Sequence, residues 1–292
     1  MTTFYRTIRN YFSLVKFSHT VFAMPFALIG FSIAVLWDDY DFSLRLLLLI
    51  ILCMIFARNS AMGFNRLVDR EFDALNPRTK NREIPSGIVN KRSAAVFVIV
   101  NSVLFMSTTF FINNLALFLS PLALLIILGY SLTKRFTALC HFILGLGLSL
   151  APIGAYISVT GHFSLLPVIY SFIVLTWVSG FDIIYALQDD EFDKSMSLHS
   201  VPSATGRKRA ITISIFVHVV TIILVIIAGN MGNGGWLFWT GAAIFSFLLI
   251  YQHLIVKHND LSRVTVAFGT TNGFASILFS IFFILDLLVR NQ

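Results

Sequence analysis

The stretch LRLLLLIILCMIFARNSAMGFNRLVDREFD, residues 44–73, begins as a nearly unbroken run of apolar residues and ends in charge. A helix needs about 20 apolar residues to cross roughly 30 Å of hydrocarbon, and the part of this stretch up to residue 64 meets that length. The remainder places Asn65, Asp69 and Asp73 four residues apart. The stretch therefore predicts a membrane-spanning helix that ends in a row of oxygen-bearing side chains.

The rest of the chain is as rich in apolar residues as the first part of this stretch suggests. Of its 292 residues 57% are hydrophobic and 12% charged, and the mean hydropathy is +0.83. We expect a single all-α, polytopic membrane domain over 1–292, in which two four-helix halves are followed by a ninth helix. The apolar run at the N-terminus is too long for a cleavable signal and lacks a cleavage site, so it is expected to remain. The nine predicted spans are approximately 17–37, 43–64, 94–112, 115–132, 138–158, 164–188, 208–229, 235–255 and 265–288.

Basic residues gather on one side of this predicted topology. They occur before the first span and in the connections after spans two, four, six and eight, and only Arg45 and Arg290 remain for the other side. By the positive-inside rule the N-terminus and these connections face the cytoplasm, and the C-terminus lies outside. The net charge of +7 then reflects topology, and no nucleic-acid partner is expected. The predicted location is a bacterial-type inner (cytoplasmic) membrane.

Two of the predicted cytoplasmic connections, about 65–93 and 189–207, are long and polar, whereas the outer connections are short. Function is expected in such loops. The second connection repeats, 120 positions later, the four-residue step of the first, now in Tyr185, Asp189 and Asp193. A Pro-Ser turn and the basic start of a helix follow each motif. These parallels predict two related halves.

The two motifs have the chemistry of a metal and phosphate site. Residues four apart advance only about 40° around a helix, so each motif lines one face. Neighbouring carboxylates on one face repel by about 0.2–0.5 kcal/mol unless a cation lies between them. Carboxylate oxygens suit Mg²⁺, which also takes waters and phosphate oxygens. Two Mg²⁺ would balance Asp69, Asp73, Asp189 and Asp193 and leave a diphosphate to be met by basic side chains. Those available on this side are Arg58, Arg66, Arg78, Arg82, Lys134 and Arg135.

Three polar side chains are predicted on the same faces but at other depths. Arg58 lies inside a predicted span, where an arginine costs roughly 2.5–3.5 kcal/mol, so it should face a polar cavity. Asp182 is seven residues before Asp189 and is either a functional carboxylate or a partner of Arg58 or Lys134. Tyr185 either hydrogen-bonds a diphosphate oxygen or a metal-bound water, or anchors the helix at the membrane interface.

Other polar side chains have simpler interpretations. Cys53 and Cys140 are far apart and lack CxxC spacing, so we expect two buried thiols. His141 is expected to be a satisfied histidine of the core. Lys134 and Arg135 form a short basic connection that either signals topology or closes the same cavity as the acidic motifs.

Two rival functions use similar residues. A secondary transporter would also turn aspartates and an arginine toward a cavity, but near the midplane of the membrane, whereas these aspartates lie at predicted helix ends. An intramembrane aspartyl protease needs one facing pair of carboxylates rather than two clusters with metal-site spacing. A solvated surface is the ordinary explanation of a charge run, and the repetition of the motif at one depth argues against it.

The phrases NRLVDREFD and NREIPSG, LTKRFT, and DIIYALQDDEFD resemble the two aspartate-rich motifs and the basic loop of the UbiA-type intramembrane aromatic prenyltransferases. The resemblance covers nearly the whole chain. It is strongest to the 4-hydroxybenzoate polyprenyltransferase-like branch, which includes enzymes of the futalosine route to menaquinone.

This resemblance implies a Mg²⁺-dependent transfer of a polyprenyl group from polyprenyl diphosphate to an aromatic hydroxy acid, such as 4-hydroxybenzoate or a dihydroxynaphthoate, in ubiquinone or menaquinone biosynthesis. Homogentisate and heme remain alternative acceptors. The family pattern implies phosphate contacts from Arg58 and Lys134, and places Arg135 and Asp182 nearer the aromatic acceptor. It implies that the metal and the diphosphate are held by Asn65, Asp69, Asp73, Asp189 and Asp193.

Overall fold

The computed structural model describes residues 10–11, 13–15 and 23–291, and no strand occurs among them. The first half of the bundle contains α2 (Met24–Ser32), a π-helical turn η2 (Ile33–Trp37), α3 (Leu44–Val68), α4 (Arg70–Leu75), α5 (Lys91–Phe110) and α6 (Asn114–Thr133). The remainder contains α7 (Cys140–Thr160), α8 (Leu165–Ala186), η3 (Leu187–Asp189), α9 (Asp190–Ser195), α10 (Val201–Thr205), α11 (Arg207–Met231), α12 (Trp236–Ile255), η4 (Val266–Thr271) and α13 (Asn272–Arg290).

The predicted all-α, polytopic fold is confirmed. Within the described residues eight helices are long and apolar enough to cross a membrane, and each coincides with one predicted span from the second to the ninth. The first predicted span, 17–37, lies partly outside the described residues. Its described part, Met24–Trp37, is a shorter apolar helix.

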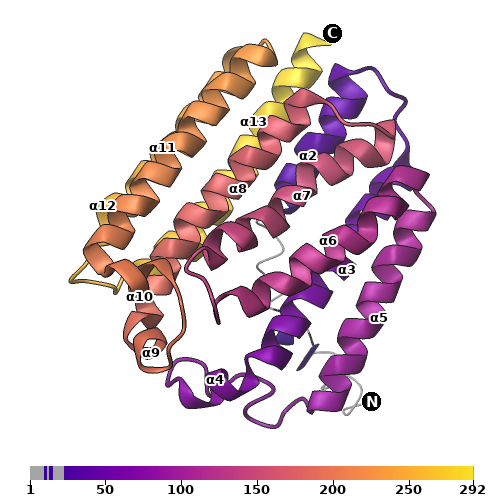
Figure 1. Ribbon diagram of the computed structural model, residues 1–292. Coiled ribbons are helices and arrows are strands. Elements are labelled where there is room, and N and C mark those ends of the chain that lie inside the picture. Colours follow the sequence, from indigo (N-terminus) through magenta and orange to yellow (C-terminus); the bar gives the residue numbers. More distant parts are fainter. Residues whose placement is uncertain (1–9, 12, 16–22, 292) are drawn as a thin grey trace.

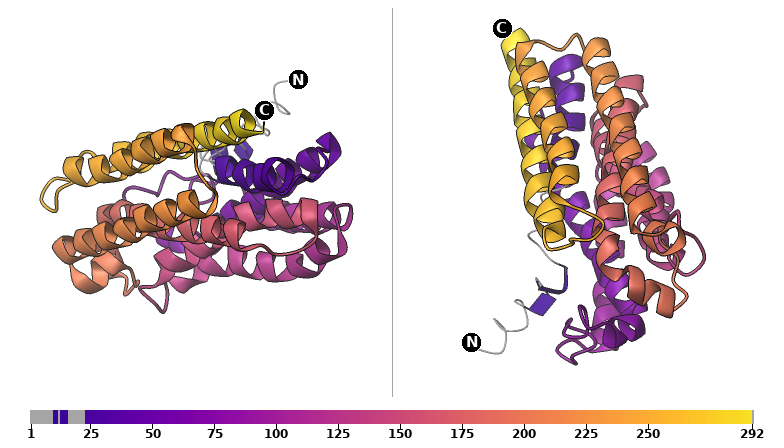
Figure 2. Two further views of the ribbon diagram at one scale, coloured as in Figure 1. Left: turned by 90° about the horizontal axis from the view of Figure 1, so that it is seen from above. Right: turned by 90° about the vertical axis from the view of Figure 1, so that its left-hand side faces the viewer.

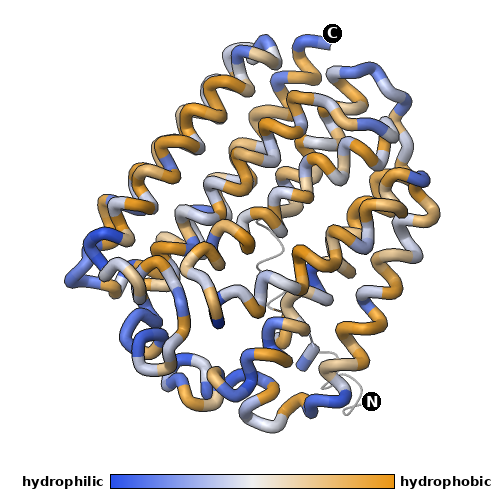
Figure 3. The backbone as a smooth tube through the Cα atoms, in the orientation of Figure 1, coloured by the Kyte–Doolittle hydropathy of each residue, from blue (hydrophilic) through white to orange (hydrophobic). Residues whose placement is uncertain are grey.

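The two long polar connections lie at one end of the bundle. The long helices run side by side, while α4, α9 and α10 lie together at the end opposite the C-terminus (Figure 1). A second viewing direction shows the same separation (Figure 2). Apolar residues dominate the long helices, and hydrophilic residues gather around α4 and α9 (Figure 3). The two acidic motifs are therefore brought to the same end of the molecule.

The order of the elements repeats. The short helix α4 begins at Arg70 and α9 begins at Asp190, 120 positions later. Each follows a long helix, α3 or α8, and each precedes another long helix whose first residue is basic, Lys91 or Arg207. The helix α13 has no counterpart in this repeat. This order agrees with two related halves and a final helix.

Both motifs differ from the prediction in one respect, because neither lies on one uninterrupted helix. The backbone breaks at Asp69 (φ −90°, ψ 4°) and at Asp189 (φ −111°, ψ 6°), between the helix that precedes each residue and the helix that follows it. Aspartate is a weak helix former, and this sparsely populated backbone region is enriched at functional sites. The hydrogen bonds from Asp69 N to Asn65 O (3.0 Å) and from Asp73 N to Asp69 O (2.8 Å) continue across the first break, so its side chains remain close.

The densest packing lies on one side of the bundle, among α2, α8, α12 and α13. Phe26, Trp177, Phe245 and Phe279 are fully buried there, with ring centroids 5.1–6.5 Å apart. Aromatic pairs at such distances contribute about 0.5–1.5 kcal/mol each beyond their buried area. The indole N–H of Trp177 donates to Asn272 Oδ1 at 2.9 Å. This rigid side supports α7 and α8, which also face a cavity.

The close packing of α2 on α7 is testable at Gly30. A Cβ atom added there would lie 2.0 Å from the carbonyl oxygen of Pro152, whereas a Cβ added at Gly154 meets no heavy atom within 4 Å. We expect Gly30→Ala to destabilise the protein by about 1–3 kcal/mol through overpacking. Thermal unfolding in detergent should show this loss for Gly30→Ala and no loss for Gly154→Ala. Equal melting temperatures of the two variants would contradict the packing described.

Candidate active site

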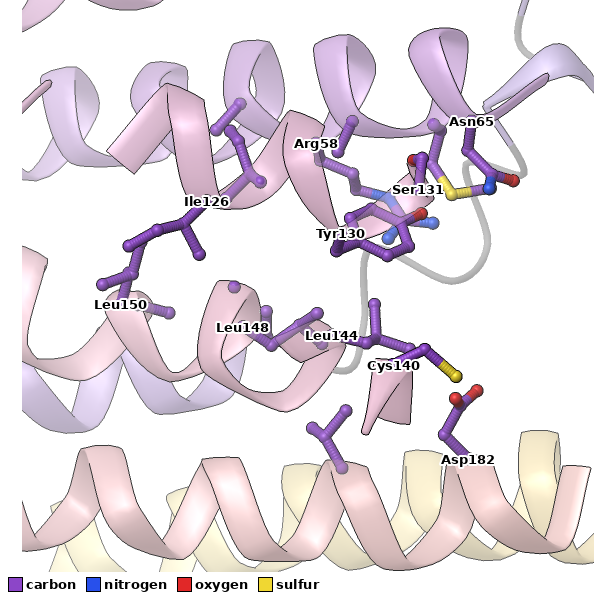
Figure 4. Close-up of a pocket in the computed structure, with 18 of the residues that line it drawn as sticks. Arg58, Asn65, Ile126, Tyr130, Ser131, Cys140, Leu144, Leu148, Leu150 and Asp182 are labelled. Atoms are coloured by element: carbon purple, nitrogen blue, oxygen red, sulfur yellow. The ribbon is translucent and has the colours of Figure 1, made fainter. Parts of the chain in front are cut away.

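A cavity of about 940 Å³ opens between α3, α4, α6, α7 and α8. Figure 4 shows part of it, with Arg58 and Asn65 on α3, Tyr130 on α6, Cys140 on α7 and Asp182 on α8. The structure brings every predicted site residue to this one cavity. Its lining includes Arg58, Asn65, Arg66, Asp69, Asp73, Arg78, Arg82, Lys134, Arg135, Asp182, Tyr185, Asp189 and Asp193.

A bidentate ion pair joins the two halves at the head of the cavity. Arg78, in the loop after α4, donates from Nε to Asp189 Oδ1 at 2.9 Å and from Nη2 to Asp189 Oδ2. Its Nη1 donates to the hydroxyl of Tyr185 at 2.9 Å. The side chain of Asn76 donates a further hydrogen bond to Asp189 Oδ1 at 2.9 Å. The first loop therefore holds the second motif in place through fork-shaped, charge-assisted hydrogen bonds.

Two further motif aspartates are buried, and each has a basic partner. Asp73 Oδ1 accepts from Arg82 Nη1 at 2.6 Å, whereas its Oδ2 is buried without a hydrogen-bond partner among the described residues. Asp193 Oδ1 lies 2.7 Å from Lys134 Nζ, and its Oδ2 accepts from Ser200 Oγ at 3.0 Å. A buried carboxylate oxygen that lacks a partner is costly, so Asp73 still has capacity for a donor or a cation.

Asp69 lies at the junction of α3 and α4, where both of its carboxylate oxygens have polar neighbours. Asn65 Nδ2 donates to its Oδ2 at 2.9 Å, and Arg135 Nη2 approaches its Oδ1 at 3.4 Å while donating to Val68 O at 2.8 Å. Burial, together with the negative charge of Asp73, raises the pKa of Asp69 to about 6, against the opposing effect of Arg135. The ionised form of Asp69 is therefore favoured by additional positive charge.

The donor set fits a hard divalent cation in its chemistry. Carboxylate and amide oxygens are what Mg²⁺ binds, and the unpartnered Oδ2 of Asp73 is an oxygen that a cation would satisfy. Among the described residues, however, no three side chains of histidine, cysteine, aspartate or glutamate already form a metal-binding group. The motif carboxylates face arginine or lysine instead. A cation here would have to complete its coordination with oxygens from outside the protein.

Away from the motifs the cavity becomes apolar. Ile126, Leu144 and Leu148 line it at middle depth (Figure 4). On α6 its lining extends from Lys134 to Ala116, a distance of about 27 Å at 1.5 Å per residue. The cavity thus has a charged head and an apolar extension, and the two together are nearly as long as the hydrocarbon core is thick.

The sequence analysis missed or misjudged three cavity residues. Asn76 and Tyr130 line the cavity but lie outside the four-residue step of the motifs, which was the signal used. Tyr130 lies beside Arg58 (Figure 4). His141 is buried as predicted, yet it also lines the cavity, and its Nδ1 lies 2.7 Å from Asp182 Oδ2. No spacing in the sequence indicated that role.

The fold and this cavity define a polytopic membrane protein with a long cavity that is charged at one end and apolar beyond it. The family model described as the UbiA prenyltransferase family matches residues 23–283. The chain therefore belongs to the UbiA prenyltransferase family, and it is a membrane-embedded prenyltransferase.

Several proteins of known name or structure are similar to it. A 4-hydroxybenzoate octaprenyltransferase of Aliivibrio fischeri (strain MJ11) is 26% identical over 80% of this chain and 82% of the relative, and one of Nitrosospira multiformis is 27% identical over 85% and 84%. The apo structure of a UbiA homologue from Aeropyrum pernix K1 has a TM-score of 0.79 and 29% identity, covering 94% of this chain and 98% of that one. A UbiA homologue from Archaeoglobus fulgidus bound to DMAPP and Mg²⁺ has a TM-score of 0.71 and 22% identity, covering 96% and 99%.

The contact between the halves predicts a large effect of Arg78→Ala. Asp189 would keep its charge in a cavity while losing a bidentate partner, so the variant should be destabilised, with a coupling energy to Asp189→Ala of about 1–3 kcal/mol. Arg70→Ala is the matched control, because Arg70 pairs with the largely exposed Glu71 and exposed pairs contribute little. A thermal-unfolding double-mutant cycle in detergent measures both. A coupling near zero for Arg78 and Asp189 would contradict the proposed role of this pair.

Proposed function

We propose that this prenyltransferase moves a polyprenyl group from polyprenyl diphosphate to an aromatic hydroxy acid, 4-hydroxybenzoate or a dihydroxynaphthoate, in quinone biosynthesis. The observation that carries the proposal is the distribution of charge in the cavity. Four motif aspartates, each paired with a basic side chain, lie at one end of a cavity about 27 Å long, and the lining beyond this end is apolar. Homogentisate and heme are alternative acceptors. The curated relatives cited above are named for 4-hydroxybenzoate and support that ring, at 26–27% identity.

The head of the cavity suits a diphosphate and Mg²⁺ together. Asn65, Asp69, Asp73, Asp189 and Asp193 would hold the metal, and the homologue from Archaeoglobus fulgidus, which shares the fold, was solved with Mg²⁺ and DMAPP. Mg²⁺, when bound, neutralises diphosphate oxygens and makes the diphosphate a better leaving group. Three partners of the aspartates in the structure, Arg78, Arg82 and Lys134, are then the cations that meet the remaining phosphate charge.

Charge counting supports an anionic ligand that binds together with a cation. The four motif aspartates are balanced by the four basic residues that pair with them, and Arg58 and Arg66 are balanced by Glu83 and Asp182 in the same lining. A divalent cation bound at the motifs would therefore give the cavity a surplus of positive charge, which attracts a diphosphate and stabilises it as its negative charge grows during bond cleavage. Neither a transporter of cations nor a protease needs such a surplus.

Different residues of the chain bind the diphosphate, contact the acceptor and exclude water. Arg58 and Lys134 bind diphosphate oxygens, and Tyr185 donates to one of them. The bond between C1 of the prenyl group and the diphosphate oxygen breaks with its electron pair going to the diphosphate, and an electron-rich ring carbon forms a new bond to C1. Asp182 accepts the hydrogen bond of the ring hydroxyl, which increases the electron density of the ring. The apolar lining excludes water that would otherwise capture the allylic cation.

The membrane accounts for the remaining geometry. We place the protein in a bacterial-type inner membrane with the motifs facing the cytoplasm, because the basic connections lie at the motif end. The diphosphate head then meets the motifs at the cytoplasmic surface, while the lipid-like tail enters the apolar extension without leaving the hydrocarbon. The apolar part of the cavity and the hydrocarbon of the membrane therefore both accommodate the prenyl tail.

The metal assignment predicts that Asp69→Asn abolishes transfer while leaving the fold intact. The substitution keeps the shape of the side chain but removes the charge that a cation needs, so turnover should fall at least about 10³-fold. Glu71→Gln is the matched control, because its exposed side chain lies two residues further along the chain, on α4 and outside the cavity. Transfer of labelled prenyl diphosphate by purified protein in lipid, with and without EDTA, measures both. Normal turnover by Asp69→Asn at saturating Mg²⁺ would contradict the assignment.

The tail assignment predicts that Gly154→Phe selects against long prenyl groups. Gly154 lines the apolar extension with open space around it, and a benzyl group there would fill the path of the tail. We expect kcat/KM to fall about 10-fold or more for an octaprenyl diphosphate and to change little for DMAPP. The control is Gly129→Phe, since Gly129 also has open space but does not line the cavity. The assignment fails if both prenyl lengths are affected alike.

The acceptor assignment predicts that Arg135→Lys raises the KM for the aromatic acid far more than the KM for the diphosphate. Arginine grips a carboxylate with two parallel hydrogen bonds that lysine cannot make, and lost ground-state binding appears in the KM of the substrate concerned. Steady-state kinetics with 4-hydroxybenzoate and with phenol measure the effect. Equal weakening of both substrates would place Arg135 on the diphosphate, and efficient prenylation of phenol would exclude a carboxylate grip.

A further inference from the structure

His141 connects the deep carboxylate of the cavity to the loop of the second motif. It is the second residue of α7 and only 2% of its surface is exposed. Its Nδ1 lies 2.7 Å from Asp182 Oδ2 on α8. Its Nε2 accepts a hydrogen bond from the backbone N–H of Val201, the first residue of α10, at 3.2 Å. Both ring nitrogens are therefore engaged, each with a different segment.

These two contacts define which nitrogen carries the proton. A backbone N–H can only donate, so Nε2 must be the acceptor and must lack a proton. The single proton of the neutral ring then lies on Nδ1 and is donated to Asp182, which must be ionised to accept it well. The imidazole thus holds Asp182 as a carboxylate while its ring remains neutral. The carboxylate points from α8 into the cavity beside Cys140 (Figure 4).

The Val201 contact leads directly to the second aspartate motif. Ser200 precedes Val201, is fully buried, and forms the cap of α10 with Ser203. The Ser200 hydroxyl also donates to Asp193 Oδ2 at 3.0 Å. A continuous path of hydrogen bonds and one peptide unit therefore runs from Asp193 through Ser200, Val201 and His141 to Asp182. The position of the deep carboxylate depends on the loop that carries a motif aspartate.

We propose that His141 is a positioning residue for the transfer reaction, which fixes the rotamer and the ionised state of Asp182 and ties both to the loop at Asp193. The proposal rests on the proposed function, in which Asp182 accepts the hydrogen bond of the acceptor's hydroxyl. As the ring carbon bonds to C1 and the diphosphate departs with the electron pair of the broken C–O bond, the hydroxyl proton moves to Asp182. The ring carbon then loses its own hydrogen as a proton to the departed diphosphate, and Asp182 returns its proton to the ring oxygen.

Two substitutions separate the hydrogen bonds of His141 from its volume. Leucine is of similar size but can neither donate to Asp182 nor accept from Val201. Glutamine carries one donating and one accepting group at its end and can restore both contacts. We expect His141→Leu to lower kcat about 10- to 100-fold, with the KM for prenyl diphosphate unchanged, and His141→Gln to recover most of the loss.

Ser179→Ala is the matched control. Its buried hydroxyl donates to the backbone oxygens of His141 and Leu175, so the variant loses a buried hydrogen bond on the same helix pair without touching the imidazole. We expect its kcat to remain near the wild-type value. If Ser179→Ala and His141→Leu lose kcat equally, or if His141→Gln is no better than His141→Leu, the positioning role is wrong and His141 only supports the packing.

A double-mutant cycle with Asp182→Asn tests whether His141 acts through Asp182. If it does, adding His141→Leu to Asp182→Asn lowers kcat no further. Additive losses would overturn the proposal. Wild-type kcat for His141→Leu alone would overturn it while leaving the proposed function standing, whereas failure of the wild-type protein to transfer a prenyl group to any phenolic acid would overturn the proposed function and the positioning role with it.

Nitrogen NMR tests the two hydrogen bonds of His141 directly, and this test does not depend on the activity of any variant. In protein labelled with ¹⁵N at histidine, the resonances that disappear in His141→Gln belong to His141. We expect Nδ1 at the chemical shift of a protonated nitrogen and Nε2 at that of an unprotonated one. The reverse assignment would show that Val201 does not donate to this ring and would overturn the proposed path.

Discussion

The balance of charge at the head of the cavity is the constraint on which the rest of the site depends. Four aspartates near hydrocarbon are tolerable only with positive charge close by, because a carboxylate removed from water is costly. The structure supplies that charge from three separate segments: the loop after α4, the connection between α6 and α7, and the interior of α3. Arg78 and Lys134, from the first two of these segments, are the ion-pair partners of Asp189 and Asp193, so removing either segment would leave a carboxylate of the second motif without its basic partner.

The pairing also joins the two halves of the molecule. Arg78 belongs to the first half and Asp189 to the second, and they are separated by 111 residues. Lys134 follows the last helix of the first half and reaches Asp193 in the second motif. The basic partners of the second motif thus come from outside it. Each half alone would expose unbalanced charge at a membrane surface, so assembly of the halves and assembly of the site are one event.

The sequence predicted the positions of the helices well, but it did not predict which residues of the loops contact one another. Apolar length locates the spans because every backbone group in hydrocarbon must be bonded within its own helix. The four-residue step located the motif aspartates because helical geometry converts spacing into a shared face. Neither rule predicts contacts between residues that are far apart in the sequence. The choice of Arg78 rather than Arg82 for Asp189, and the contact of His141 with Val201, depend on how loops fold over the bundle, which no local period encodes.

The breaks at Asp69 and Asp189 connect these observations. A continuous helix would carry each motif straight out of the membrane, parallel to its neighbours, with its three side chains spread over about 12 Å of helix length. A break at the middle residue separates the last segment, α4 or α9, from the long helix before it, and both short helices lie at the same end of the bundle (Figure 1). Both halves break at the equivalent aspartate, and the first loop reaches the second break through Asn76 and Arg78, which donate to Asp189. The weak helix propensity of aspartate, which is a cost in the interior of a span, is here what places its charge where a diphosphate would meet it.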